Sequence, residues 1–381
     1  MKRSDLAVLL FLPLLASCSG TSTSGNVPQS AATDSLSGSR MSAQSGRSPN
    51  GSPDLLYIGN VGNNSITVYP SNAQGNTAPL YVIAGSNTGI DNPGQLSEDP
   101  QGNLYVANGS LAVPSVKPAI LVFGHGANGN VPPIRKIAGP LAVHKIQAMT
   151  VDQATGEIYV FEGTAPHTEG RSILARFARN ATGNVAPLAR AYDLDPAVQL
   201  ASDSSGTGVI EANQPQDYKD FFWGTSTYPA QFRNDSSPTA IYYVLAFFSR
   251  GIADDASTRT YLTSGEASFA RCTRPFCGDT ISGIYRFAED TTGNFSYNGF
   301  PSSLTPPVLS IITSDTCGTQ LAVAPGSSPN TYVTHSIKFG SCPTDGVYVY
   351  ASNASGNAAP LRVLSGSATQ LNEPYGIYEG K

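Results

Sequence analysis

The sequence predicts an all-β fold built from repeated four-stranded antiparallel sheets, and three observations lead to this prediction. Short runs that alternate apolar and polar residues, rich in β-branched and aromatic types, recur between turns of Gly, Asn and Pro. Charged residues are only 13% of the 381 residues, whereas 38 are Gly and 28 are Pro, which favours many turns over long helices. The runs also recur in a fixed order, which indicates a long internal repeat.

Residues 1–18 form a targeting signal. Residues 1–3 are basic, and residues 6–15 form an apolar run too short to span a bilayer comfortably. The segment ends in "LASC", which resembles the lipobox of bacterial lipoproteins. The resemblance implies that Cys18 is acylated and becomes the mature N-terminus. Because Ser19 rather than Asp follows, it also implies an outer-membrane address, facing the periplasm or the cell surface. An ordinary secretory signal cut near Ala16 is the alternative.

Residues 19–53 are rich in Ser, Gly and Thr and contain almost no large apolar side chains. Such a segment cannot bury enough apolar surface to offset the conformational entropy that ordering would remove. We predict a flexible tether, with a root-mean-square span of roughly 30 to 35 Å if it behaves as a Gly/Ser-type coil. The folded domain would then stand clear of the membrane.

The repeated unit contains four predicted strands. One run precedes a Gly-Asn turn, such as "SITVY" before "YPSNAQGNTAP" (residues 69–79), and another run, "PLYVIAG", follows it. Two more runs flank an Asp-centred turn, as in residues 93–109. The Gly of the Gly-Asn pair supplies a positive φ that other residues adopt at a cost. Four strands at a period near 54 residues are typical of a β-propeller blade.

Six units are predicted. The interval from Phe177 to Phe287 is twice the usual period, and "FRNDSSPTAIYYVLAF" at Phe232 fills the gap with a degenerate turn. Residues 54–60 and 372–381 supply the two halves of one blade. We therefore predict a six-bladed β-propeller over residues 54–381, closed by pairing of the N- and C-terminal strands, with irregular insertions at about 213–282. A closed ring has no free sheet edge, so we expect a monomer. Five or seven blades are the alternative.

The second strand pair carries a family resemblance. Residues 93–108 read P-x-x-x-x-x-D-x-x-G-N-L-Y-V-A-N, which is similar to the NHL-type propeller repeat, especially in its bacterial lipoprotein versions. The resemblance covers about residues 54–381 and departs from the pattern at 213–282. It implies a propeller fold but little about function, because propellers serve as enzymes, ligand binders and protein platforms.

Four cysteines besides Cys18 lie in the last third of the chain. An exported chain with an even number of cysteines suggests disulfides. We expect Cys272 to pair with Cys277 and Cys317 to pair with Cys342. The alternative is a metal site, but "C-x4-C" lacks a second pair at zinc spacing, so we expect no metal.

Polar side chains on the first strand of each unit are candidates for a site, because that strand lines the channel of a propeller. A crown of amides could bind a polar ligand such as a sugar or peptide, although we favour amides that bind channel water and each other. Asp99, Asp152 and Asp203 could hold a cation, but Asp in such turns usually caps its own backbone. The four histidines fall at different points of the repeat, and the sequence places no acidic partner beside them. The amides are Gln95, Gln147, Gln199 and Gln320.

Residues 214–230 form a predicted over-long loop that holds the single Trp. Long loops on rigid scaffolds often carry binding sites. The aromatic residues could form a contact patch for a protein or glycan, or pack beneath the loop as a small satellite core. They are Tyr218, Phe221, Phe222, Trp223 and Tyr228.

Two functions are compatible with these patterns. We favour a non-catalytic binding or scaffold propeller held at the outer membrane by its lipid anchor, with an envelope protein or polysaccharide as partner, because the chain contains no G-x-S-x-G motif, P-loop or paired zinc motif. The alternative is a channel-centred hydrolase or lyase, by analogy with lactonase-type and NHL-type enzymes. No cofactor is expected. A net charge of -5 without a Lys/Arg cluster argues against a nucleic-acid partner.

Overall fold

A computed structural model describes most of the chain from residue 54 to residue 380, all within one compact unit, Ala43–Lys381. The signal peptide with Cys18 and the tether 19–53 lie outside the described residues, so these predictions stand untested. The described ranges are 54–109, 116–163, 172–194, 197–202, 208–213, 223–229, 240–244, 246–255, 260–270, 278–288, 308–312, 314–323, 330–338 and 342–380.

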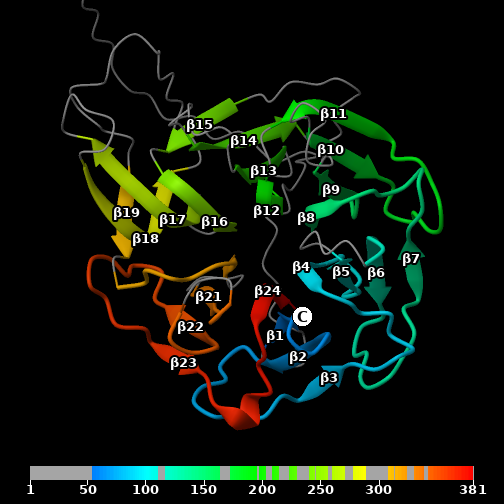
Figure 1. Ribbon diagram of the computed structural model, residues 1–381, viewed down its shortest axis with the longest axis horizontal. Helices are drawn as coiled ribbons and strands as arrows, with labels where there is room; N and C mark the ends of the chain where they lie inside the picture. The colour runs from blue at the N-terminus through cyan, green and yellow to red at the C-terminus, as the bar shows by residue number, and fades with distance from the viewer. Residues whose placement is uncertain are drawn as a thin grey trace, which may run out of the picture. The chain divides into compact units, whose positions relative to one another are not determined.

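The described residues form six four-stranded antiparallel sheets and no α-helix (Figure 1). This confirms the predicted all-β class and the four-stranded antiparallel unit. Within these residues no helix is long and apolar enough to cross a membrane. The first three sheets are β24 (Pro374–Gly380), β1 (Leu55–Asn60), β2 (Ser65–Pro70) and β3 (Tyr81–Ile83); β4 (Pro93–Glu98), β5 (Leu104–Asn108), β6 (Ala119–Phe123) and β7 (Arg135–Ile137); and β8 (Ile146–Val151), β9 (Ile158–Glu162), β10 (Ser172–Phe177) and β11 (Ala189–Leu194).

The other three sheets follow the same order. A 3-10 helix, η1 (Ser367–Thr369), precedes the last strand of the chain. The sheets are β12 (Ala197–Ser202), β13 (Gly208–Asn213), β14 (Trp223–Pro229) and β15 (Ala240–Val244); β16 (Ala246–Asp255), β17 (Thr260–Ala270), β18 (Gly278–Ala288) and β19 (Val308–Ile312); and β20 (Leu321–Val323), β21 (Thr331–His335), β22 (Gly346–Tyr350) and β23 (Arg362–Leu364).

The predicted loop at 214–230 is wrong in its second half, where the chain forms β14 and pairs with both β13 and β15. Trp223 is opposite Val244, and Tyr228 is opposite Val209. Alternating Thr and Ser in "WGTSTYP" suit a strand with two neighbours. The alternation of this run, rather than the aromatic residues at its ends, indicates the secondary structure of the segment.

The first strands of successive sheets lie beside one another. β24 contacts β4, β4 contacts β8, β8 contacts β12, β12 contacts β16, β16 contacts β20, and β20 contacts β24 (Figure 1). The two ends of the described domain meet in one sheet, where β1 pairs antiparallel with β24 from Leu55 opposite Gly380 to Asn60 opposite Pro374, with one irregularity. Segments more than 300 residues apart in the sequence therefore share a ladder of backbone hydrogen bonds.

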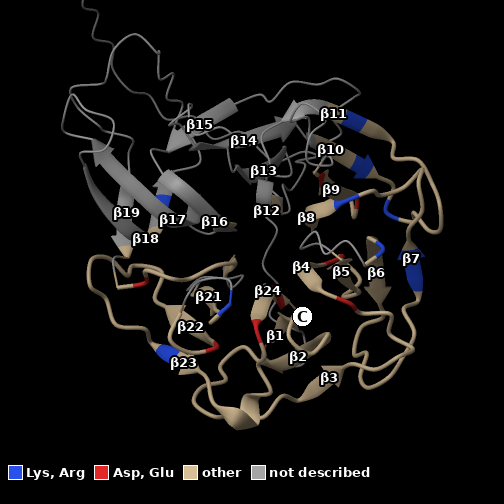
Figure 2. Cartoon of the chain, viewed as in Figure 1, with Lys and Arg blue, Asp and Glu red and all other residues tan. Residues whose placement is uncertain are grey.

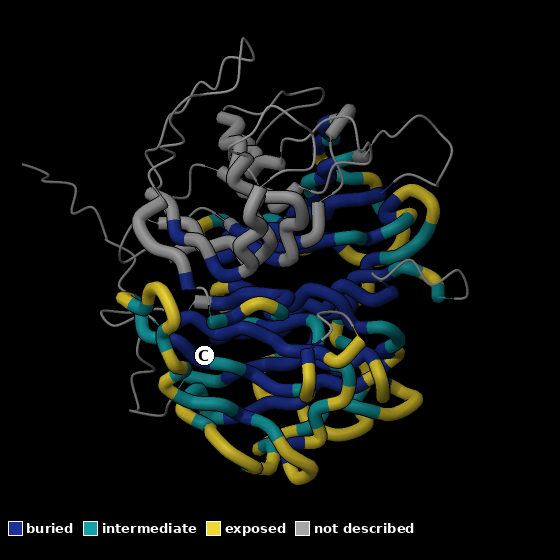
Figure 3. Tube along the Cα trace, turned by 60° about the vertical axis from the view of Figure 1, so that its left-hand side comes forward, coloured by how far each residue is buried: buried dark blue, intermediate teal, exposed yellow. Residues whose placement is uncertain are grey.

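Apolar side chains fill the space between neighbouring sheets. One cluster joins Tyr105 and Val122 of the β4–β7 sheet to Met149, Val160 and Phe177 of the next sheet. All five residues are fully buried. Figure 3 shows the strands largely buried and the turns exposed. The central strands β2, β5, β6 and β9 are buried along almost their whole length, which explains why they read as nearly continuous apolar runs.

The repeated Gly-Asn turn fastens several of the described sheets to their neighbours. The backbone N–H of Gly183 donates to the carbonyl of Lys136 at 2.7 Å, and the carbonyl of Gly183 accepts from the N–H of Ala138 at 3.1 Å. The Asn184 side chain accepts from the N–H of Leu141 at 2.8 Å. We call this arrangement the Gly-Asn clasp. It recurs with Gly75–Asn76 on β23 and with Gly129–Asn130 on β3.

The outer strands β7 and β23 carry cationic residues (blue in Figure 2). Arg135 on β7 donates to the carbonyl of Ala181 at 3.1 Å, in the turn of the next sheet. Arg362 on β23 donates to the carbonyl of Ser71 at 3.3 Å. These guanidinium groups therefore bind backbone carbonyls of the adjacent sheet and help to hold it.

Candidate functional site

The predicted amides of the first strands reach into neighbouring sheets. Gln95 on β4 is 3% exposed, and its Oε1 accepts from the backbone N–H groups of Met149 on β8 and Leu200 on β12, both at 3.0 Å. Its Nε2 donates to the carbonyl of Leu200. One side chain therefore joins the first strands of three sheets.

Gln199 on β12 repeats this arrangement. Its Oε1 accepts from the N–H of Ile252 on β16 at 2.9 Å and from the N–H of Leu321 on β20 at 3.2 Å. Its Nε2 donates to the carbonyl of Leu321 at 2.8 Å. The amides of Gln95 and Gln199 thus bond to strand backbones, where we had favoured bonds to channel water and to each other. Every polar atom of these two groups already has a protein partner.

The other two predicted amides are placed differently. Gln320 is fully buried, and its side chain bonds to the hydroxyl of Tyr375, whose pKa burial raises to about 12. Gln147 on β8 is half-buried and packs over Gly163. Its Oε1 has no hydrogen-bond partner among the described residues. The four glutamines therefore do not converge on one ligand position, and ligand binding by them stays a prediction.

The Asp-centred turns are stabilised by their own carboxylates. Asp99 Oδ1 accepts from the backbone N–H groups of Gln101 at 3.0 Å and Asn103 at 2.9 Å. Asp152 Oδ1 accepts from the N–H of Ala154 at 2.7 Å. These bonds satisfy turn amides in the way that Asp commonly does, so they support the structural interpretation. Asp203 lies outside the described residues.

Two histidines have acidic partners that the sequence did not reveal. The Nδ1 of His144 lies 3.1 Å from a carboxylate oxygen of Glu162, and the His144 side chain is 58% exposed. Burial raises the pKa of Glu162, while His144 acts in the opposite direction. The imidazole is open to solvent whereas the Glu162 side chain is only 2% exposed, so the pair lies at the edge of the buried region. The second pair is buried and lies beside a disulfide.

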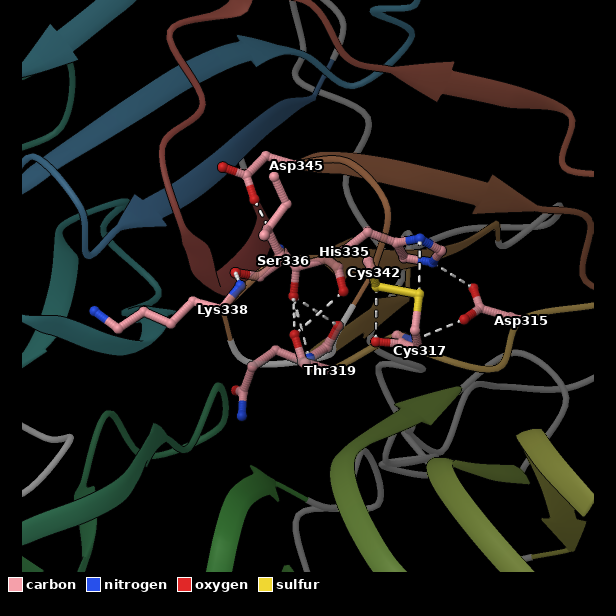
Figure 4. Close-up of a disulfide and its surroundings, with 12 residues drawn as sticks. Asp315, Cys317, Thr319, His335, Ser336, Lys338, Cys342 and Asp345 are labelled. Carbon is pink, nitrogen blue, oxygen red and sulfur yellow. Dashed lines mark hydrogen bonds and ion pairs between the residues drawn. A yellow bond between two sulfur atoms is a disulfide. The ribbon is translucent and has the colours of Figure 1, made fainter. Parts of the chain in front are cut away.

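Cys317, Cys342, His335 and Asp315 lie close together, and we call this group the Cys-His-Asp cluster (Figure 4). Cys317 and Cys342 form a disulfide with a Cα–Cα distance of 5.4 Å. The Nδ1 of His335 lies 3.6 Å from the sulfur of Cys317, and its Nε2 lies 2.8 Å from Asp315 Oδ2. The other predicted pair, Cys272 and Cys277, lies outside the described residues.

The strand register of one sheet assembles the cluster. β20 and β21 pair antiparallel, so the segment before β20 lies beside the end of β21. Thr319 bonds to the backbone of Thr334 at 2.9 Å, which brings the chain around Cys317 next to His335. β21, the second strand of this sheet, therefore carries the imidazole of His335. Continuing the β20–β21 register by two residues places Thr319 opposite His335, and Cys317 lies two residues further along the chain.

The predicted aromatic patch is only partly described. Trp223 and Tyr228 lie at the two ends of β14 rather than in a loop. Tyr218, Phe221 and Phe222 lie outside the described residues. A contact patch made of these five residues stays a prediction.

Buried carboxylates gather where two first strands end. Glu98 on β4 and Glu379 on β24 are 3% and 6% exposed. Burial, followed by the charges of Asp54 and Glu98, raises the pKa of Glu379 to about 9. Glu379 therefore carries a proton at neutral pH, and one of its oxygens has no partner among the described residues.

No protein-family model and no curated protein matches this chain. Solved structures resemble it in fold. A chain of Kuenenia stuttgartiensis hydrazine synthase aligns with a TM-score of 0.51 and 12% identity over 75% of this chain and 74% of that chain. A chain of a nidogen/laminin complex aligns with a TM-score of 0.48 and 11% identity over 86% and 98%, and one of a mitotic checkpoint complex with 0.43 and 12% over 71% and 67%.

These neighbours are β-propeller-type folds. At 12% identity, the similarity to hydrazine synthase indicates a shared fold and nothing about function. We draw no conclusion from the two alignments with lower TM-scores. The NHL-type and lipoprotein resemblances find no support in these comparisons and stay predictions. The chain therefore has an all-β, β-propeller-like fold.

Proposed function

We propose that the chain is a lipoprotein whose domain is a six-bladed β-propeller, closed where β1 pairs with β24. The sequential contacts between first strands and the Gly-Asn clasps support this arrangement. We further propose that the protein works in the bacterial envelope as a non-catalytic binding or scaffold module, with an envelope protein or polysaccharide as partner. Cys18 would anchor it to the outer membrane through acyl chains, since more than one chain gives lasting attachment.

One observation carries the non-catalytic reading. Gln95 and Gln199 would be the first ligand-binding groups in a channel. Their side-chain amides instead form hydrogen bonds with the backbones of β8, β12, β16 and β20. Asp99 and Asp152 likewise bond within their own turns. Recruiting any of these groups to a substrate would leave buried backbone amides unpaired, which costs free energy. Binding through exposed surfaces needs no such exchange.

The alternative, a channel-centred hydrolase or lyase, rests on one observation. Glu98 and Glu379 lie buried on neighbouring first strands, and perturbed carboxylates in such places are candidate acids or bases. In such an enzyme, protonated Glu379 would act as the general acid.

The test uses the full-length protein in its native envelope. Photo-crosslinking followed by mass spectrometry is expected to capture a recurrent protein or glycan partner. A Cys18→Ser variant is expected to leave the membrane fraction and to lose that partner. Turnover of lactone or ester substrates that Glu379→Gln abolishes would overturn the non-catalytic proposal in favour of the hydrolase.

A further inference from the structure

The Cys-His-Asp cluster holds three metal-binding atoms within a small volume. The sulfurs of Cys317 and Cys342 and a ring nitrogen of His335 all lie within 4.8 Å of one another. Cys342 is 3% exposed and His335 is 5% exposed, while Cys317 is half-buried. The cluster can therefore be reached from solvent on the side of Cys317.

The imidazole is held with one nitrogen facing the sulfurs. Asp315 has a fully buried side chain, accepts from the backbone N–H of Gly318 at 2.9 Å and lies 2.8 Å from His335 Nε2. This contact assigns the proton to Nε2 and leaves the lone pair of Nδ1 directed towards Cys317. Tyr348 stacks on the imidazole with ring centroids 3.7 Å apart. Metal-binding histidines are commonly fixed by a carboxylate in this way.

The spacing suits a tetrahedral zinc site. Zinc–sulfur bonds of about 2.3 Å and zinc–nitrogen bonds of about 2.0 Å place the two ligand atoms about 3.5 Å apart at a tetrahedral angle. The observed distance from Cys317 sulfur to His335 Nδ1 is 3.6 Å. The two sulfurs are bonded here as a disulfide and would have to separate before both could bind the cation. A brace needs two cysteines alone, so the buried His335–Asp315 pair calls for a further role.

We propose that Cys317, Cys342 and His335 bind one thiophilic divalent cation of the Zn²⁺ class once the disulfide is reduced, with Asp315 as the positioning residue for His335. Two thiolates and one imidazole favour such a cation over Mg²⁺ or Ca²⁺. Three protein ligands leave one coordination position open. The disulfide would therefore switch the site between an oxidised brace and a reduced metal centre.

The chemistry balances with a dithiol as reductant. The dithiol supplies two electrons and two protons, the bond between the Cys317 and Cys342 sulfurs breaks, and the reductant leaves as its own disulfide. The cation then displaces both thiol protons to solvent. The His335 imidazole, with its proton on Nε2 facing Asp315, donates the Nδ1 lone pair to the cation. This proposal does not depend on the binding or scaffold function proposed above.

The test titrates Zn²⁺ and Co²⁺ into the full-length protein carrying Cys272→Ser and Cys277→Ser, reduced with a phosphine. We expect one equivalent of Zn²⁺ to bind in competition with a chromophoric chelator, and Co²⁺ to produce a thiolate-to-cobalt charge-transfer band. Cys317→Ser and Cys342→Ser should each abolish the band. Asp315→Asn should weaken Zn²⁺ binding about 10- to 100-fold while keeping one equivalent.

Three binding results would overturn the proposal. The reduced protein binds no stoichiometric metal, the oxidised protein binds it equally well, or Cys317→Ser leaves binding unchanged. Far-UV circular dichroism of the reduced protein is recorded in parallel. Loss of the β-sheet spectrum on reduction would also contradict the proposal, because it would show that the cysteines serve only as a brace.

Discussion

Single glycines determine how closely neighbouring sheets approach. Gly139 has a φ of +116°, and a Cβ there would lie 2.5 Å from Asn184 Oδ1. Gly85 and Gly366 occupy the same place against Asn130 and Asn76. Each Gly-Asn clasp therefore needs a glycine on one sheet and an asparagine on the next.

Gly139→Ala is expected to lower the free energy of unfolding by about 2 to 4 kcal/mol, because the backbone is strained and the clasp is displaced. Gly126→Ala is the matched control. Its φ is also positive, at +72°, but a Cβ there would meet nothing within 4 Å, so only about 1 to 2 kcal/mol should be lost. Urea unfolding measures both. Equal losses would mean that the clasp contributes nothing.

Glu379 should make stability fall as pH rises. Its pKa is about 9 in the folded protein and near the ordinary Glu value when unfolded, so between about pH 4.5 and 9 the unfolded state binds fewer protons. Stability is therefore highest below this window and declines through it. Glu379→Gln should remove this decline and be the more stable protein at pH 8, by a few kcal/mol at most. Parallel stability curves for the two proteins from pH 5 to pH 8 would show that Glu379 is not buried as described.

At the scale of strands, buried amides hold first strands of different sheets together. Gln199→Ala would leave the N–H groups of Ile252 and Leu321 and the carbonyl of Leu321 without their partner. We expect a loss of about 2 to 4 kcal/mol in the free energy of unfolding. Gln147→Ala is the control, because its Oε1 has no partner to lose, and it should cost less than about 1 kcal/mol. A similar cost for both would refute the bridging role of Gln199.

The sequence predicted strands well because alternation and turn chemistry are local signals. Ser65–Pro70, Ala119–Phe123 and Gly346–Tyr350 form where the periodic runs indicated. The destination of the amides could not be predicted, because Gln199 bonds to Leu321, 122 residues away. The pairing of Cys317 with Cys342 agrees with the prediction from cysteine number and position. The approach of His335 to Cys317 was not predicted, since it depends on hairpin register. The prediction of a loop at 214–230 was wrong for Trp223–Pro229, because the aromatic residues of this segment suggested a binding loop although its alternating Thr and Ser are typical of a strand.

At the scale of the whole domain, the disulfide braces the sheet beside the chain ends. It closes a loop with a sequence separation of 25. Replacing Cys317 and Cys342 together by Ala should lower the free energy of unfolding by about 3.5 kcal/mol on the loop-entropy estimate. Thermal unfolding of the oxidised proteins measures the difference. An unchanged midpoint would mean that the unfolded chain is already restrained there by other contacts.

The arrangement of the six sheets depends most on the meeting of the two chain ends. β1 has β2 on one side and β24 on the other, so its backbone amides are divided between two partners. Removing β24 should expose the amides that face it. Amides that face β2 should keep their protection, because that pairing remains.

Hydrogen exchange of Leu55–Asn60 tests the pairing of β1 with β24. It is compared between the full chain and a chain ending at Leu371. β9 (Ile158–Glu162) serves as the reference segment. We expect slow exchange of β1 in the full chain and much faster exchange in the shortened chain, beyond any change in β9. Unchanged exchange of Leu55–Asn60 after the truncation would contradict a domain closed by its own two ends.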